Sequence, residues 1–177
     1  MKRTLIFAAL IAALIAPVWA QRVGDTVTVN GQRYTIQSIN GDDILLRKAG
    51  RYEVIEESLS WTDAKAAAER RGGYLAVITS AEEQKTIEDL VTRSGGARRG
   101  YWLGGYSEGN KVFKWVTGEP MGYTNWAPTQ PDGSANTQRI LFLRTTTMGA
   151  RNENNFGKWD DDRISGSDRY GYIIEWD

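Results

Sequence analysis

Residues 60–93 read SWTDAKAAAERRGGYLAVITSAEEQKTIEDLVTR, and this pattern predicts two helices separated by a short strand. Ser60 is placed to cap the first helix, because a serine hydroxyl can accept a hydrogen bond from a backbone N–H of the first turn. The alanine-rich sequence that follows favours helix, and Gly72-Gly73 ends it. Tyr74 to Ile78 is an apolar run of strand length.

The second helix is expected to begin at a capping box, Ser80-Ala81-Glu82-Glu83. Ile87, Leu90 and Val91 recur at helical spacing and should form its inner face. Gly95-Gly96 stops it.

Short strands surround the two helices. Tyr52 to Leu59 is one candidate, and four more are expected at Tyr101-Trp102-Leu103, Val112 to Val116, Ile140 to Leu143 and Tyr170 to Trp176. Two helices followed by chain rich in short strands and long loops indicate an α+β domain.

Residues 21–50 are expected to form a small N-terminal β extension. Thr26-Val27-Thr28-Val29 and Tyr34-Thr35-Ile36 flank Asn30-Gly31, which is a strong hairpin signal. Asn40-Gly41 makes a second turn before Ile44-Leu45-Leu46. Because so short a meander is marginal alone, we expect it to pack on the main domain.

Residues 1–20 have the pattern of a secretory signal peptide. Lys2 and Arg3 precede an apolar run from Leu5 to Val18, and Val18-Trp19-Ala20 favours cleavage before Gln21. An uncleaved anchor is the alternative, but the run is short for a membrane span. We therefore expect an exported protein, secreted or periplasmic, without a membrane span after cleavage.

Charge and composition exclude several classes of function. Removing Lys2 and Arg3 from the 22 basic residues leaves 20 against 22 acidic ones, so no basic surface suggests a nucleic-acid partner. The chain has no histidine, which excludes Ser-His-Asp triads and histidine-ligated zinc. It also has no cysteine, so the domain must be held together by packing alone.

Two short motifs offer oxygen ligands for a cation. Gln130-Pro131-Asp132 and Trp159-Asp160-Asp161 together supply carboxylates and one amide. Oxygen ligands of this kind suit a hard cation such as Ca²⁺, with waters or a ligand's hydroxyls in the remaining positions. Either motif alone says little, because three-residue matches occur by chance.

Further motifs stand in a fixed order around these two: Ser60-Trp61, Ala64, Gly72-Gly73-Tyr74-Leu75-Ala76, Tyr101-Trp102-Leu103-Gly104-Gly105, Trp115, Gly118-Glu119-Pro120, Thr124-Asn125-Trp126-Ala127-Pro128 and Gly171-Tyr172-Ile173-Ile174-Glu175. With this ordered set, residues 51–177 resemble a C-type lectin-like domain, in a bacterial, cysteine-free form. The resemblance implies that the terminal strands pair and close a loop around the two helices. It also implies that a long loop region holds a Ca²⁺ site, with Pro131 in the cis form; an ordinary trans turn is the alternative.

By position, the resemblance implies that the Ca²⁺ ligands are Gln130, Asp132, Gln138, Asp160 and Asp161. The first four would also contact the sugar. The family usually has Glu where this chain has Gln138, and Asn where it has Asp160. These departures offset each other in charge, and ligand charge is a main determinant of Ca²⁺ affinity. We therefore expect Ca²⁺ as the cofactor.

The same two departures bear on the choice of sugar. An amide donates a hydrogen bond and a carboxylate only accepts one, so exchanging them reverses the hydrogen-bond order toward two vicinal hydroxyls. Gln-Pro-Asp is the galactose-type order in the family, which implies a galactose-like preference. The aromatic residue that galactose binders place soon after this motif is missing from residues 133–139. Phe156 is either a substitute for it or a core residue, whereas Trp126 and Trp159 read as core.

Apolar residues occupy the family's disulfide positions. These fall on Ala68 with Ile174, and on Ile140 with Ile164. We expect each pair to bury apolar area where a covalent link would otherwise lie.

Two other classes of function remain as alternatives. One is a lectin-like module that binds a protein or a cell surface without Ca²⁺, because fold alone does not settle function. An enzyme is disfavoured, since Asp160 and Asp161 are adjacent and do not make the separated acid–base pair of a glycoside hydrolase. The pattern of residues 144–158 does not indicate a role.

Overall fold

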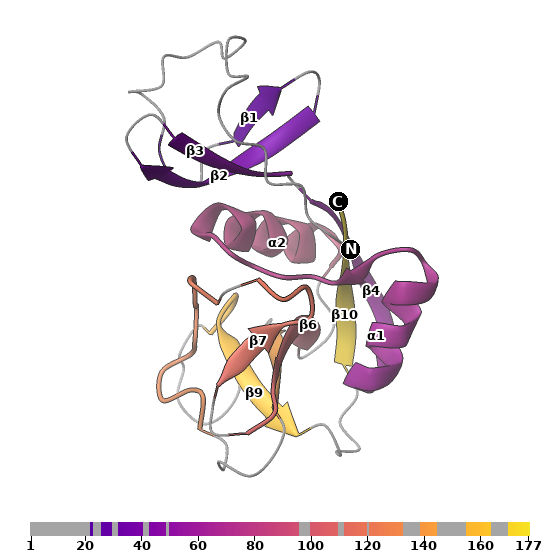
Figure 1. The fold of residues 1–177 in the computed structure, drawn as a ribbon. Helices are drawn as coiled ribbons and strands as arrows, with labels where there is room; N and C mark the ends of the chain where they lie inside the picture. Colours follow the sequence, from indigo (N-terminus) through magenta and orange to yellow (C-terminus); the bar gives the residue numbers. More distant parts are fainter. Residues whose placement is uncertain are drawn as a thin grey trace.

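The computed structural model describes residues 22, 26–29, 32–40, 43–48, 50–95, 100–109, 112–119, 121–132, 139–144, 155–163 and 170–177. These residues form two helices, a three-stranded sheet and a larger sheet of seven strands (Figure 1). The expected leader and most of the segment 144–158 lie outside the described residues.

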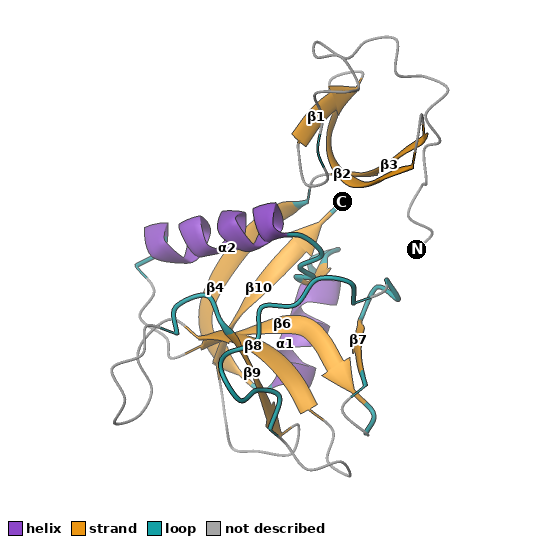
Figure 2. Ribbon diagram, turned by 90° about the vertical axis from the view of Figure 1, so that its left-hand side faces the viewer, coloured by secondary structure: helices purple, strands orange, loops and turns teal. Residues whose placement is uncertain are grey.

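The larger sheet closes the domain by pairing its first and last strands. β4 (Arg51–Leu59) runs antiparallel to β10 (Tyr170–Trp176), as the resemblance implied. β10 then pairs in parallel with β6 (Gly100–Ser107), so strands far apart in the sequence lie side by side (Figure 2). β8 (Arg139–Arg144) follows β6, and β9 (Trp159–Arg163) follows β8, both antiparallel. β5 (Tyr74–Leu75) joins β10, and β7 (Phe113–Trp115) joins β6.

The two predicted helices lie on either side of the β4–β10 pair (Figure 1). α1 (Trp61–Arg70) begins at Ser60, whose hydroxyl accepts a hydrogen bond from the backbone N–H of Asp63 at 3.2 Å. α2 (Ala81–Arg93) begins at Ser80 in the same way. Glu83 differs from a standard capping box, because its carboxylate accepts from the backbone N–H of Thr79 at 2.7 Å rather than from that of Ser80.

Two clusters of buried side chains form the core of this domain. One gathers under α2 and centres on Ile87, Val91, Trp115 and Trp159, and the other gathers around α1. Leu90 is only half-buried, whereas Glu83 and Gln84 are buried on the inner face of α2, where only apolar residues were expected. Two polar side chains of α2 therefore face the interior of the protein.

Two strand predictions needed correction. The apolar run 74–78 is a strand only over Tyr74–Leu75; beyond it, Ala76 bonds to the backbones of β10 and β6 from a non-strand conformation. β9 was not predicted at all, because aspartate is depleted in strands and residues 160–162 are all Asp. Backbone pairing with apolar β8 makes this segment a strand.

The predicted packing at one disulfide position is confirmed. Ala68 and Ile174 are both fully buried, and both belong to the α1 cluster. For the second pair, Ile164 and the side chain of Ile140 lie outside the described residues.

The N-terminal hairpin and third strand are present as predicted. β1 (Thr26–Val29), β2 (Gln32–Asn40) and β3 (Asp43–Lys48) form a separate antiparallel meander (Figure 1). Ile36 is fully buried within it. Neither α1 nor α2 has the length and apolar composition needed to cross a bilayer.

Candidate functional site

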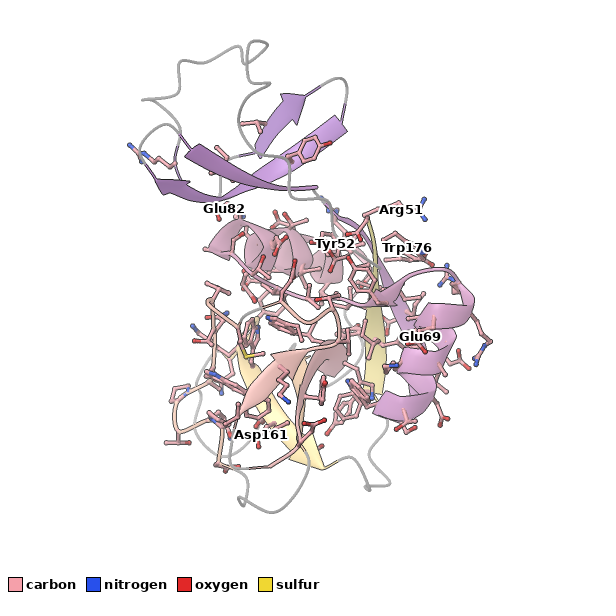
Figure 3. All side chains as sticks on the ribbon, in the orientation of Figure 1. Arg51, Tyr52, Glu69, Glu82, Asp161 and Trp176 are labelled. Carbon is pink, nitrogen blue, oxygen red and sulfur yellow. The ribbon has the colours of Figure 1, made fainter. Side chains whose placement is uncertain are left out.

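The loop of residues 121–132 presents the first motif next to β9. The peptide bond between Gln130 and Pro131 is cis, which confirms that prediction. Asp132 follows it with an exposed side chain, while Gln130 is half-buried. Figure 3 shows Asp161 in the part of the domain that lies away from Trp176 and from the N-terminal sheet.

One backbone N–H joins the two motifs. The N–H of Asp132 donates to Oε1 of Gln130 at 2.9 Å and to Oδ1 of Asp161 at 3.0 Å. Both oxygens therefore converge on a single donor, although the two motifs lie 29 residues apart in the sequence. Asp161 is 7% exposed whereas Asp132 is exposed, so the contact between them is partly buried at the protein surface.

The neighbouring carboxylates of β9 have different partners. Oδ1 of Asp160 accepts from the backbone N–H of Asp161 at 2.8 Å. Oδ2 of Asp162 accepts from the hydroxyl of Tyr170 on β10 at 2.9 Å, away from the first motif. Asp161 of this acidic run thus bonds directly to the Gln130–Asp132 loop.

Trp159 fixes the start of β9 against the same loop. Its backbone N–H donates to the carbonyl of Asn125, and its carbonyl accepts from the N–H of Ala127, both at 2.8 Å. Trp159 is fully buried, which confirms its predicted core role, and Trp126 is half-buried against the same cluster. Tyr123 makes an edge-to-face contact with Trp159, and its burial, helped by nearby Glu88, raises the pKa of its hydroxyl.

Two amide residues that were not predicted to take part in the site support this arrangement. Gln84 of α2 and Asn125 both donate to the carbonyl of Gly157, at 2.7 and 2.8 Å. Gly157 has a φ of +79°, and a Cβ there would overlap the Glu88 carboxylate. The glycine conformation, which no motif in the sequence indicated, lets the loop approach α2 closely.

The side-chain oxygens that meet here are of the kind that Ca²⁺ requires, but they form only part of a Ca²⁺ site. Oε1 of Gln130 and Oδ1 of Asp161 each carry more than one lone pair, so the bond from Asp132 leaves each able to ligate a cation. The exposed Asp132 carboxylate adds a further oxygen. Among the described residues, however, no three acidic side chains gather in a metal-binding arrangement. Gln138 lies outside them.

Phe156 has the core position that was one of its two predicted roles. It is half-buried and packs against the α2 cluster. The segment 145–154 lies outside the described residues.

Residues 57–170 match the Lectin C-type domain family. The chain belongs to this family of C-type lectin domains. Its members are binding domains, so the chain is a binding module and not an enzyme, as expected.

Animal lectins are among the similar proteins. A perlucin-like protein of Mytilus galloprovincialis is 28% identical over 128 residues, which covers 71% of this chain and 76% of that protein. The galactose-specific lectin nattectin of Thalassophryne nattereri is 37% identical over 78 residues, covering 42% of this chain and 48% of nattectin. Because these relatives are eukaryotic, the expectation of a bacterial source stays a prediction.

Solved structures confirm the α+β C-type lectin fold. The carbohydrate-recognition domain of the mouse scavenger receptor C-type lectin is 27% identical, with a TM-score of 0.57, and the alignment covers 72% of this chain and 88% of that domain. Human lithostathine has a TM-score of 0.62 over 73% of this chain and 92% of its own, at 20% identity, which is similarity of fold alone.

Proposed function

We propose that this C-type lectin domain binds glycans in a Ca²⁺-dependent manner at the Gln130-Pro131-Asp132 loop and the start of β9. The observation that carries the proposal is the Asp132 N–H, which gathers the Gln130 and Asp161 oxygens from two distant segments. Gln138 and Asp160 would complete the ligand set, together with Gln130, Asp132 and Asp161.

The side chains of Gln130 and Asp132 would select the sugar through hydrogen bonds to its hydroxyls. A bound Ca²⁺ would supply the positive charge to which two vicinal sugar hydroxyls bind. Oε1 of Gln130 faces the Asp132 N–H, which leaves its Nε2 free to donate to one hydroxyl. The exposed Asp132 carboxylate can accept from the other hydroxyl. The amide precedes Pro131 and the carboxylate follows it, and this order supports the galactose-type preference.

The similar proteins support a glycan ligand. Nattectin is named as a galactose-specific lectin, and the mouse scavenger receptor domain as a carbohydrate-recognition domain. We extend this role to the present chain, together with export to a secreted or periplasmic location, where glycoconjugates are accessible. Residues 1–20 would serve as the signal peptide and 21–50 as an N-terminal extension of the lectin domain at 51–177.

A second candidate is a lectin-like module that binds a protein or cell-surface partner without Ca²⁺. It is favoured by the lack, within the described ranges, of three acidic side chains in a metal-binding arrangement. In that function, Asp161 and Asp162 of β9 would serve the fold through their hydrogen bonds to the Asp132 N–H and the Tyr170 hydroxyl.

Glycan-array binding with and without Ca²⁺ separates the two functions. We expect the wild type to bind galactose-containing glycans in millimolar Ca²⁺ and to lose them in chelator. Asp132→Ala should lose binding under both conditions. Binding that persists in chelator would favour the second function, and Ca²⁺-dependent binding to mannose but not galactose would overturn the sugar preference.

A further inference from the structure

Gln84 is a buried polar residue whose side chain joins α2 to the segment of residues 157–159. It lies on α2 and is 4% exposed. Its Nε2 donates to the carbonyl of Gly157 and to Oε1 of Glu88, both at 2.7 Å. Its Oε1 accepts from the indole N–H of Trp159 at 2.9 Å. Since an indole N–H can only donate, these contacts fix the orientation of the amide.

The contacts hold the segment that leads directly into Asp160 and Asp161. Gly157 and Trp159 are bonded to Gln84 on either side of Lys158, which anchors this short segment to α2. Trp159 is held further by edge-to-face contacts with Trp115 and Trp126, at centroid distances of 5.6 and 6.0 Å. Gln84 therefore sets where β9 begins.

The same segment also positions the other half of the candidate site. Asn125 binds the carbonyl of Gly157 through its side chain and the N–H of Trp159 through its carbonyl, and Ala127 binds the carbonyl of Trp159. The chain then continues to Gln130 and Asp132. A shift of residues 157–159 on α2 would consequently move both partners of the Asp132–Asp161 hydrogen bond.

We propose that Gln84 is a positioning residue for the ligand site, acting through Trp159 and Gly157 to hold Asp161 against the Asp132 N–H. The expected effect on Ca²⁺ binding rests on the proposed function. The positioning of Asp161 and Asp132 can be measured without any ligand.

The test compares Gln84→Met with Trp61→Phe. Methionine has a similar length and no hydrogen-bonding amide, so all three contacts are lost. Trp61 is a matched control, because it is also buried and its indole donates to the carbonyl of Leu103 at 2.9 Å, but it belongs to the α1 cluster. Backbone hydrogen exchange in the absence of metal is read at Trp159 and Asp132, and Ca²⁺ affinity by calorimetry. Gln84→Asn replaces Gln84→Met if the latter does not fold, because asparagine keeps a neutral amide but is one carbon too short to reach Gly157 and Trp159 together.

We expect exchange at Trp159 and Asp132 to be at least about tenfold faster in Gln84→Met than in Trp61→Phe, because a local opening leaves other amides protected. Ca²⁺ affinity should fall by about tenfold in Gln84→Met, at the lower end of the range for residues that orient metal ligands, and by less than about twofold in Trp61→Phe. Equal exchange in the two variants would overturn the inference. Selective exchange together with a wild type that binds no Ca²⁺ would uphold the positioning role and refute the proposed function instead.

Discussion

Asp161→Asn separates the structural role of this carboxylate from its role as a cation ligand. Asparagine keeps an oxygen at the position that accepts from the Asp132 N–H at 3.0 Å, but removes the charge. Hydrogen bonds to charged groups contribute about 1.5–3 kcal/mol and neutral ones about 0.5–1.5 kcal/mol. The variant should therefore lose about 1 kcal/mol of unfolding free energy in chelator.

The loss in Ca²⁺ should be larger. If removing the charge costs about 2 kcal/mol of binding free energy, the Kd for Ca²⁺ rises about 30-fold. At a concentration of about 100 times the wild-type Kd, Ca²⁺ stabilises the wild type by about 2.7 kcal/mol and the variant by only about 0.9 kcal/mol. At roughly 3 °C per kcal/mol, the increase in Tm on adding Ca²⁺ should be about 5 °C smaller in the variant.

The assay is thermal unfolding followed by circular dichroism in Ca²⁺ and in chelator. Asp162→Asn is the matched control, since Asp162 is the next residue of β9 but accepts from the Tyr170 hydroxyl. It should be destabilised in chelator to a similar extent and should keep the full increase in Tm with Ca²⁺. An Asp161→Asn variant that also keeps the full increase would refute the assignment of Asp161 as a ligand.

Three further predictions concern the scaffold. Gly104→Ala should lower the free energy of unfolding, measured with denaturant, by at least about 2 kcal/mol, because the added Cβ would lie 2.5 Å from the carbonyl oxygen of Leu75. Gly122→Ala is the control and should stay within about 0.5 kcal/mol of wild type, because the space around its added carbon is open. Equal effects of the two variants would contradict the packing at Gly104. Ser80→Ala should cost about 1 kcal/mol through loss of the α2 cap, and no change in unfolding free energy would show that this cap is unimportant. In an ultraviolet titration, the Tyr123 hydroxyl should ionise above the usual pKa of 10.0, because burial raises its pKa. Its contribution to the free energy of unfolding is full below the unfolded-state pKa and is lost as pH rises through the folded-state pKa. Tyr123→Phe should therefore lose less stability than the wild type when the pH is raised through this range.

Local signals in the sequence were sufficient for most of the scaffold. Ser60 and Ser80 cap the helices as predicted, and β1 and β2 lie on either side of Asn30-Gly31 in the sequence. These features depend on residues close together in the chain. β9 was missed because its aspartates oppose strand formation locally and only pairing with β8, a distant segment, overrides that preference.

The candidate site was also predictable where a motif in the sequence indicated it, and not where it depends on tertiary contacts. The family motif indicated Gln130, Asp132 and Asp161, which the structure brings together, and the cis form of Pro131. It could not indicate the role of Gln84: the spacing from Ile87 and Val91 places position 84 on the inner face of α2, but it does not show what the amide binds. That role depends on the close approach of the segment around Gly157 to α2, which is a tertiary property.

Calorimetric titration of the folded wild type with Ca²⁺, alongside Asp132→Ala, tests the central claim most directly. We expect the wild type to bind one Ca²⁺ at the Gln130–Asp132 loop and β9, and Asp132→Ala to show no binding over the same concentration range. A wild type that gives no binding heat and no increase in Tm at millimolar Ca²⁺ would contradict the account. Undiminished Ca²⁺ binding by Asp132→Ala would equally show that the ion binds elsewhere.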